Sequence, residues 1–150
     1  MDDPKLLPPC GYHCGVCPYR IAYKDNNEDL KAKLAKSLNI QPEDIKCEGC
    51  NSEIVFFFCK ICNLKKCVQK KGLESCVECE EFPCRKIERF PAKEFIKKLK
   101  WDVNYHKKYG KDKWIEKTIE LNTCQDCNTL NHWQAHLCKS CGNKLKDRYF

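Results

Sequence analysis

The sequence has little material for an ordinary apolar interior. Leu, Ile, Val and Phe are not abundant, while charged residues make up 33% of the 150 positions. A chain of this kind buries only a modest core, and small modules in that situation add disulfides or metal ions. Ordinary packing alone is therefore not expected to stabilise every part of this chain.

The sequence also lacks the segments that lead a chain into a membrane. The start, Met1–Pro4, is acidic and contains proline, unlike the basic and then apolar start of a signal peptide. No stretch approaches the roughly 20 apolar residues of a membrane span, and the longest strongly apolar run is 54–58. We therefore expect a cytoplasmic protein with no membrane partner, where thiols stay reduced.

Cysteine, in contrast, is abundant, with 15 residues in the chain. This density fits a disulfide scaffold or a metal scaffold. The count is odd and most cysteines form C-x-x-C pairs, in which two sulfurs can bind one metal from a tight turn. We therefore predict metal ligation. The candidate ligands are Cys10, Cys14, Cys17, Cys47, Cys50, Cys59, Cys62, Cys67, Cys76, Cys79, Cys84, Cys124, Cys127, Cys138 and Cys141.

Metal ligation alters the meaning of the formal net charge of +7, which counts each cysteine as neutral. A zinc ion with four thiolates contributes −2, so three such sites would lower the net charge to about +1. The basic composition is thus weak support for nucleic-acid binding. We expect a protein partner instead, and the sequence does not indicate an oligomeric state.

Cysteine placement divides the chain into three regions. Residues 1–90 form a cysteine-rich metal-binding region, residues 91–121 lack cysteine and are predicted to be helical, and residues 122–150 hold the last four cysteines. The predicted fold is a small, metal-stabilised α+β protein. It combines short helices and a short buried strand in the first region, central helices, and the β-hairpins of a C-terminal zinc ribbon.

Local patterns place the individual elements. Capping residues at 25–28 and leucines every four residues predict a helix to about Leu38, with a stop at Asn39. A short helix is predicted at 42–45, and the run 54–58 is predicted to be the buried strand.

Two further helices are predicted in the central region, from Pro91 to Gly110 and over 112–121. The first helix has two rows of side chains on roughly opposite faces. One row is apolar, and the other, the aromatic stripe, has lysines beside it. The aromatic stripe either packs between the flanking regions or contacts a partner, and we favour packing. Its members are Trp101, Tyr105 and Tyr109, with Lys97, Lys98 and Lys108 alongside.

The C-terminal motifs Cys124-x-x-Cys127 and Cys138-x-x-Cys141-Gly142 are separated by ten residues. Zinc prefers four tetrahedral ligands, which two such turns supply, and the glycine suits a positive φ. The segment 124–145 resembles the common zinc-ribbon module, including at Asn131, Ala135, Leu137, Lys144 and Leu145. This resemblance implies a structural zinc on β-hairpins that often serve docking.

The N-terminal cysteines Cys10, Cys14 and Cys17 have C-x3-C-x2-C spacing. Radical S-adenosylmethionine enzymes use this spacing, but they need a longer partial barrel, and no glycine-rich loop follows here. A [4Fe–4S] cluster completed by Cys67 or Cys84 is an alternative, because a Cys-Pro step occurs in ferredoxin motifs. His13 is another candidate fourth ligand.

The other eight N-terminal cysteines divide most simply into two quartets, although cross-braced pairing would group them differently. The simple division gives Cys47, Cys50, Cys59 and Cys62, then Cys67, Cys76, Cys79 and Cys84.

The whole first region resembles a known family. The motifs are CGxxCGxCPY at 10–19, CxGC at 47–50, CxxCxxxxC at 59–67, KGLExCxEC at 71–79 and FPC at 82–84. They are similar to those of small cysteine-rich prokaryotic proteins, frequent in anaerobes and classified as a domain of unknown function. The resemblance implies metal binding without an assigned reaction.

Function follows from the kind of metal site. A closed zinc site with four cysteines has no free position for water or substrate. We therefore expect two or three Zn²⁺ sites in a non-catalytic docking or regulatory module. The alternative is an iron–sulfur protein with its cluster at the N-terminal triad, serving electron transfer or redox sensing. An enzyme is the least favoured hypothesis, because only His13 lies near the triad as a candidate base.

Overall fold

The computed structural model describes residues 1–150, and the chain is mainly helical, with 49% of residues in helices and 3% in strand-like conformation. Short 3₁₀ helices accompany the α-helices at η1 (Pro4–Leu6), η2 (Cys14–Val16) and η3 (Pro42–Asp44). The α-helices are α1 (Pro18–Lys24), α2 (Glu28–Leu38), α3 (Phe57–Lys60), α4 (Asn63–Lys71), α5 (Arg85–Glu88), α6 (Lys93–Tyr109) and α7 (Lys111–Asn122).

The structure contains no β-sheet, so the predicted α+β class is wrong. The run 54–58 does not form a buried strand, because α3 begins at Phe57 and only Phe56 of this run is buried. Cysteine pairs turn the chain on both sides of the run, and the bond from the Glu48 N–H to the Ile54 carbonyl at 2.8 Å does not extend into a ladder. Its backbone bonds are local instead, with the Cys59 N–H donating to the Phe56 carbonyl at 2.8 Å.

The predicted C-terminal β-hairpins are also not formed. Isolated antiparallel bridges join Thr123 to Leu130 and Leu137 to Lys144, and neither extends into a ladder. Each bridge closes a tight turn around one cysteine pair and is flanked by two backbone bonds, such as those from Cys124 to Thr129 and from Asn131 to Asn122. The pairing extends no further along the chain.

The helix predictions are largely confirmed. Asn27 caps α2 by accepting the Leu30 N–H at 3.0 Å, and Asn39 ends the helix with φ 55°. The predicted short helix appears as η3, and α6 and α7 match the two central helices within about two residues at their ends, with Gly110 between them at φ 88°. These boundaries depend on local capping, which explains why the sequence reveals them.

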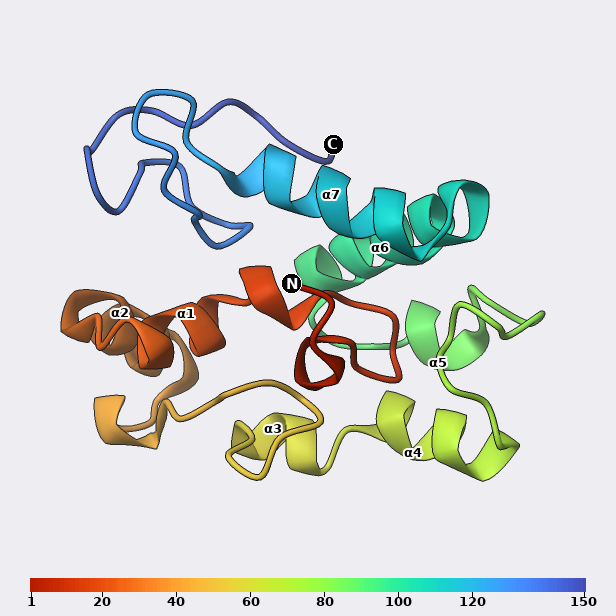
Figure 1. Cartoon of the computed structure of the whole chain (residues 1–150). Coiled ribbons are helices and arrows are strands. Elements are labelled where there is room, and N and C mark those ends of the chain that lie inside the picture. The colour runs from red at the N-terminus through yellow and green to blue at the C-terminus, as the bar shows by residue number, and fades with distance from the viewer.

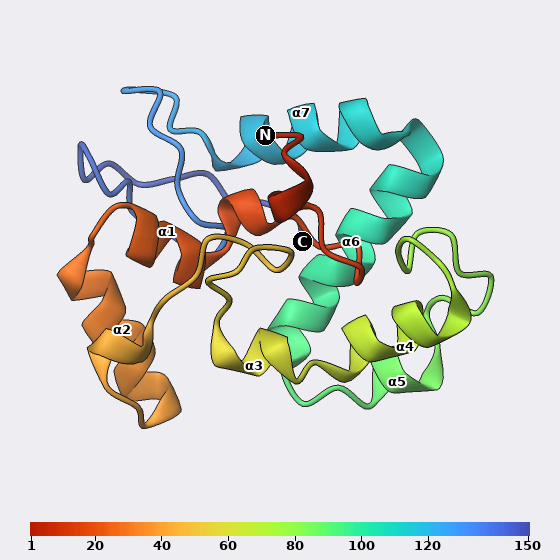
Figure 2. The same cartoon turned by 60° about the horizontal axis from the view of Figure 1, so that its bottom comes forward.

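The segment from residue 1 to 17 runs through the middle of the molecule (Figures 1 and 2). The pair α1–α2 lies on one side of it and α4–α5 on the other, while α6 and α7 cross above it in Figure 1. Buried irregular backbone needs hydrogen-bond partners. The Cys76 N–H donates to the Pro9 carbonyl at 2.7 Å, and the Trp133 N–H donates to the Val16 carbonyl at 3.1 Å.

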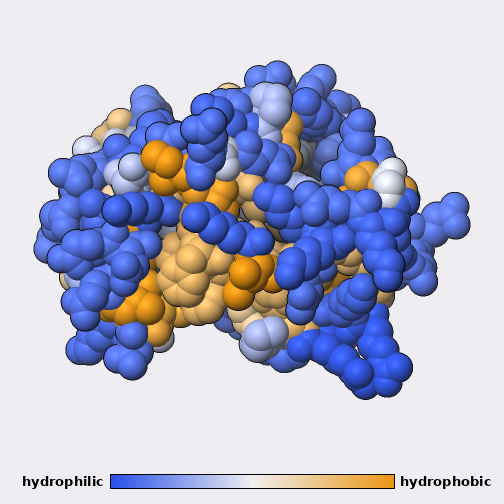
Figure 3. All heavy atoms as spheres, turned by 90° about the horizontal axis from the view of Figure 1, so that it is seen from below, coloured by the Kyte–Doolittle hydropathy of each residue, from blue (hydrophilic) through white to orange (hydrophobic).

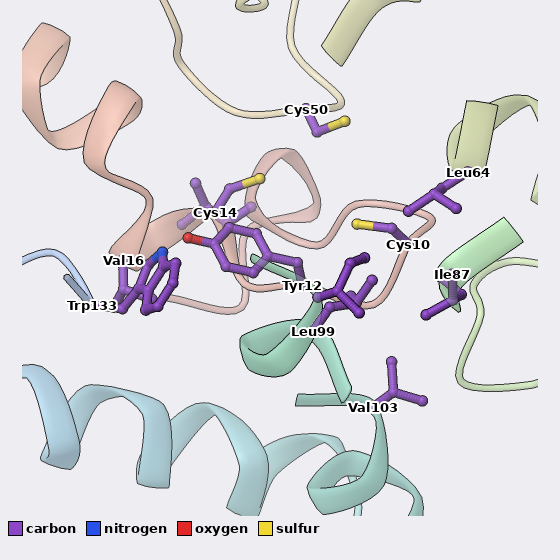
Figure 4. Close-up of a cluster of buried hydrophobic side chains, with 12 residues drawn as sticks. Cys10, Tyr12, Cys14, Val16, Cys50, Leu64, Ile87, Leu99, Val103 and Trp133 are labelled. Atoms are coloured by element: carbon purple, nitrogen blue, oxygen red, sulfur yellow. The ribbon is translucent and has the colours of Figure 1, made fainter. Parts of the chain in front are cut away.

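The main core surrounds this N-terminal segment (Figure 4). Residues from every part of the chain enter it, which ties the predicted regions 1–90, 91–121 and 122–150 together; their status as separate domains stays a prediction. The buried members are Leu6, Cys10, Tyr12, Cys14, Val16, Cys50, Leu64, Ile87, Ile96, Leu99, Val103 and Trp133.

The aromatic stripe on α6 is covered at one end and open at the other. Trp101 stacks on Tyr105 with a centroid distance of 5.0 Å and meets Tyr149 of the C-terminal tail at 4.7 Å. Tyr109 at the far end is 44% exposed. Packing, the favoured interpretation, therefore holds for Trp101 but not for Tyr109. Separately, none of the helices has both the length and the apolar character needed to cross a bilayer.

Candidate metal centre

The C-terminal cysteine quartet, Cys124, Cys127, Cys138 and Cys141, brings all four sulfurs within 4.8 Å of one another. The Sγ–Sγ distances are 3.7 Å from Cys124 to Cys141 and 3.5 Å from Cys127 to Cys138. A tetrahedral zinc site with bonds of about 2.3 Å separates its sulfurs by roughly 3.8 Å. The quartet could therefore hold a single metal ion.

Two matched turns position the four sulfurs. In the first turn, the Cys124 N–H donates to the Thr129 carbonyl at 2.9 Å and the Asn128 N–H donates to the Cys124 carbonyl at 3.0 Å. The second turn repeats both bonds, from Cys138 to Asn143 at 2.8 Å and from Gly142 to Cys138 at 3.0 Å. Asn128 (φ 56°) and Gly142 (φ 73°) both take the left-handed conformation that this turn requires. The glycine following the second cysteine pair predicts this conformation at Gly142, whereas Asn128 carries no comparable signal in the sequence.

N–H donors surround the Cys138 sulfur. The Ser140 N–H lies 3.5 Å from it and the Asn131 side-chain amide 3.6 Å from it. Burial raises the pKa of Cys138, but hydrogen bonds from the Cys141 and Ser140 backbone, the Asn131 amide and Cys127 outweigh burial and bring it down to about 6. Hydrogen bonds that favour the charged form stabilise a thiolate, which is the form that binds metal.

Asn131 joins the two turns although it is fully buried. Its amide also donates to the Thr129 carbonyl at 2.9 Å, and its Oδ1 accepts the Lys139 N–H at 2.9 Å. Its backbone N–H donates to Asn122 at the end of α7 at 2.8 Å. Sequence similarity singled out Asn131 only as a module residue, and the structure shows that it positions the sulfur of Cys138.

Trp133 fixes the quartet to the rest of the molecule. This residue lies between the two cysteine pairs, yet its side chain is buried in the main core, close to Val16 in Figure 4. The quartet itself has a very small apolar cluster, consisting of Cys124, Cys138 and Leu145 with Ala135 beside it. The role of Trp133 could not be predicted from the sequence, because nothing local distinguishes it from a surface tryptophan.

The eleven N-terminal cysteines are less tightly gathered, since no three of their sulfurs lie within 4.8 Å of one another. They fall into two neighbourhoods that meet at Cys76, and their assignment as ligands stays a prediction. Burial raises the pKa of Cys76 and Cys10, and the closeness of Cys62 to Cys76 and of Cys76 to Cys10 raises both further. Cys10, Cys14, Cys17, Cys47, Cys50, Cys59 and Cys62 line the main core or the smaller cluster beside α1 and α2. Cys67, Cys76, Cys79 and Cys84 surround a small cavity between α4 and α5.

Within the first neighbourhood, the triad lies beside the next two cysteine pairs. A hydrogen bond with Cys59 lowers the pKa of Cys50 to about 7, and the same bond raises the pKa of Cys59. The thiols of Cys17 and Cys14 are close enough to raise the pKa of Cys59 further. These contacts cross the division into a triad and a separate quartet that the simplest grouping predicts.

His13 does not face the sulfurs as a free ligand. Its Nδ1 accepts the Gly15 N–H at 3.1 Å, and its Nε2 lies 2.9 Å from the Met1 carbonyl. The ring is fully buried against Trp114, with a centroid distance of 5.2 Å. Burial lowers the pKa of His13 to about 4. Both ring nitrogens are occupied, so His13 is a structural residue in this arrangement.

Comparison with known families agrees with the motif order. A family model described as a protein of unknown function (DUF3795) matches residues 6–89, more than half of the chain. The chain belongs to the DUF3795 family. No curated protein and no solved structure matches it. The DUF3795 match covers the eleven N-terminal cysteines and ends before α6, so the C-terminal quartet lies outside the matched part.

Proposed function

We propose that this DUF3795 protein binds zinc at its C-terminal cysteine quartet and acts as a non-catalytic docking or regulatory module in the reducing cytoplasm. The observation that carries this proposal is the tetrahedral spacing of four sulfurs on two matched turns. Four protein ligands fill the coordination of zinc, which leaves no position for a substrate. The metal then serves to hold the surfaces around it.

An apolar patch at the start of α3 is the proposed docking surface, and its partner is a protein. Figure 3 shows apolar side chains gathered on this face. The patch consists of Ile54, Phe57, Phe58 and Ile61, which are 38%, 38%, 47% and 62% exposed. Contiguous exposed apolar groups of this kind mark interaction sites. The exposed Lys60 and Glu53 are adjacent in sequence to the patch residues Ile61 and Ile54, which favours a partner with an apolar centre and charges of both signs at its rim.

Metal content tests the first part of the proposal. We expect Cys141→Ser to lower the zinc content by one ion per chain, because three sulfurs hold zinc less well than four. Ser140→Ala serves as the control, since only the backbone of Ser140 contacts the Cys138 sulfur. An unchanged zinc content in Cys141→Ser would exclude this site.

The patch is tested with a double variant, Phe58→Ser with Ile61→Ser. A defined partner, identified with the wild-type chain and then purified, should bind this variant at least tenfold more weakly, the loss expected from removing one or two anchors. Tyr109→Ser, which alters an exposed aromatic residue on α6, is the matched control. Equal binding by the patch variant and the wild type would show that the patch is not the docking surface.

A second candidate function is an iron–sulfur centre in the N-terminal region, used in electron transfer or redox sensing. It is favoured by the closeness of Cys14 and Cys17 to Cys50 and Cys59, which could supply the fourth ligand in place of Cys67 or Cys84. Protein made anaerobically with ample iron should then be brown and contain acid-labile sulfide, and Cys14→Ser should lose both properties. A colourless, zinc-only preparation would exclude this candidate.

A further inference from the structure

A small cavity lies between α4 and α5, outside the C-terminal quartet. It measures about 20 Å³, and four cysteines line it together with apolar side chains such as Leu64, Phe82 and Ile87. A space of about 10–15 Å³ holds one water-sized probe, so the cavity has room for one small occupant. The four cysteines are Cys67, Cys76, Cys79 and Cys84.

The four residues reach the cavity from three directions. Cys67 lies within α4, Cys84 is the residue just before α5, and Cys76 and Cys79 come from the loop between the helices. Hydrogen bonds hold this loop: the Cys79 N–H donates to the Cys76 carbonyl at 3.2 Å, and the Lys107 ammonium donates to the Cys79 carbonyl at 3.0 Å. Four sulfurs arriving from separate backbone positions can surround an ion.

The walls favour a soft cation over water. A buried water needs two to four polar partners, whereas this cavity offers thiols and almost wholly apolar surface. Thiolates prefer zinc, copper(I) and iron. Lys71 and Lys86 also line the cavity, and the Lys71 ammonium, which pairs with Glu81, lies 3.7 Å from the Cys79 sulfur. A cation near this sulfur favours its thiolate form, which binds metal.

The size of the cavity favours a single metal ion over an iron–sulfur cluster. A [4Fe–4S] cube holds eight heavy atoms and cannot enter a space for one small occupant unless α4 and α5 move apart. The four sulfurs lie farther apart than those of the C-terminal quartet, since no three of them fall within 4.8 Å. Binding of a single ion would therefore require the four sulfurs to move closer together.

We infer that Cys67, Cys76, Cys79 and Cys84 bind a second zinc ion in the cavity between α4 and α5. This site fastens the loop 72–84 to both helices, in addition to the packing of Val77 and Phe82 against the main core. The inference rests on the proposed function in that both sites require zinc in the cell. The two sites share no ligand, so each can fail without the other.

The test is the zinc content of the full-length chain in three variants. We expect Cys79→Ser and Cys127→Ser each to lose one zinc ion per chain, and the double variant to lose two. Cys79 is only half-buried, which limits damage to the fold, and Glu80→Gln next to it is the matched control. Wild-type zinc content in Cys79→Ser would overturn the second site. Loss of zinc in Cys79→Ser but not in Cys127→Ser would overturn the proposed C-terminal site alone.

Alkylation of cysteines in the wild-type chain provides a second test, which does not depend on whether the variants fold. Trypsin releases residues 67–70 and 72–85 as separate peptides, distinct from the peptides of the C-terminal quartet. Cys67, Cys79 and Cys84 are only partly buried, so burial alone does not shield them. We expect them to resist iodoacetamide when zinc is bound and to react once a chelator removes it. Equal labelling before and after zinc removal would contradict the inference.

Discussion

The Lys98 ammonium lies 2.5 Å from the Asp102 carboxylate, and both side chains are fully buried. The second Asp102 oxygen accepts the Trp114 Nε1–H of α7 at 2.8 Å. Burial lowers the pKa of Lys98 and raises that of Asp102, while their pairing opposes both shifts. The rings of Tyr12, Trp101 and Tyr149 also enclose the Lys98 ammonium, with centroid distances of 5.3, 5.1 and 4.4 Å. The pair thus joins the N-terminal segment, both central helices and the C-terminal tail.

Removing one member of this pair should be costly. Asp102→Ala leaves the Lys98 charge buried without its partner, and breaking a buried pair in this way costs about 3–5 kcal/mol. We expect a loss of that size in the free energy of unfolding, measured by denaturant titration. Glu94→Ala is the control, because its pair with Lys97 is about 60% exposed on both sides and should contribute less than about 1 kcal/mol. Similar losses in the two variants would contradict a central role for the buried pair.

Asn131 should control metal affinity without being a ligand. Asn131→Asp keeps the shape of the side chain but replaces the amide donor to the Cys138 sulfur with a negative charge. Loss of such an outer contact typically weakens metal binding about 10–100-fold. We expect a decrease in that range, measured by competition with a zinc chelator. Asn143→Ala is the matched control, since its side chain contacts only the exposed Asp126, and it should bind zinc like the wild type.

The features that the sequence revealed are those with local causes. The spacing of Cys124, Cys127, Cys138 and Cys141 predicted a four-sulfur site, and capping at Asn27 and Asn39 predicted the limits of α2. A C-x-x-C turn and a helix cap each depend on a few adjacent residues. These parts could therefore be predicted without knowledge of the packing.

The features that the sequence did not reveal depend on distant partners. Ile54–Phe58 has a strand-like composition, but a strand forms only where another segment pairs with it. The sequence predicted Lys98 only as a lysine beside the aromatic stripe. In the structure its ammonium is buried, and the pair with Asp102 and the ring of the tail residue Tyr149 offset the cost of burying this charge. The grouping of the N-terminal cysteines likewise depends on how loops far apart in sequence meet.

Substitution of two phenylalanines in the same segment should change the stability of the protein by very different amounts. Phe56 is 2% exposed and stacks on Tyr19 with a centroid distance of 4.3 Å, whereas Phe58 is 47% exposed. Phe56→Ala should cost about 3–5 kcal/mol of stability, the usual range for a buried phenylalanine. Phe58→Ala should change stability by less than about 0.5 kcal/mol, as surface substitutions do. Thermal and denaturant unfolding of both variants checks this contrast, and equal losses would mean that the patch is part of the core.

Metal removal should unfold the C-terminal turns before the rest of the chain. The cluster around the cysteine quartet contains only Leu145 besides two cysteines, and Trp133 is the one buried apolar side chain of 123–145 that enters the main core. The main core itself contains Leu6, Val16, Leu99 and other apolar residues. Without metal, the bonds that join the two cysteine pairs are absent, so the turns lose their main stabilising contact. Hydrogen exchange on chelated protein should show loss of protection at 123–145 while α6 and α7 stay protected.

Acid should have the same effect as a chelator on these turns. The pKa of Cys138 is lowered to about 6, so this thiol is a thiolate at neutral pH and becomes protonated as the pH falls through that value. A group whose pKa is lowered in the folded state adds stability above its unfolded pKa, and that stability is lost as the pH falls. Bound metal lowers thiol pKa further and moves the loss to more acidic pH. Zinc-loaded protein should therefore keep exchange protection at 123–145 at a pH where zinc-free protein and Cys141→Ser have lost it. Identical pH profiles with and without zinc would show that the metal does not hold these turns.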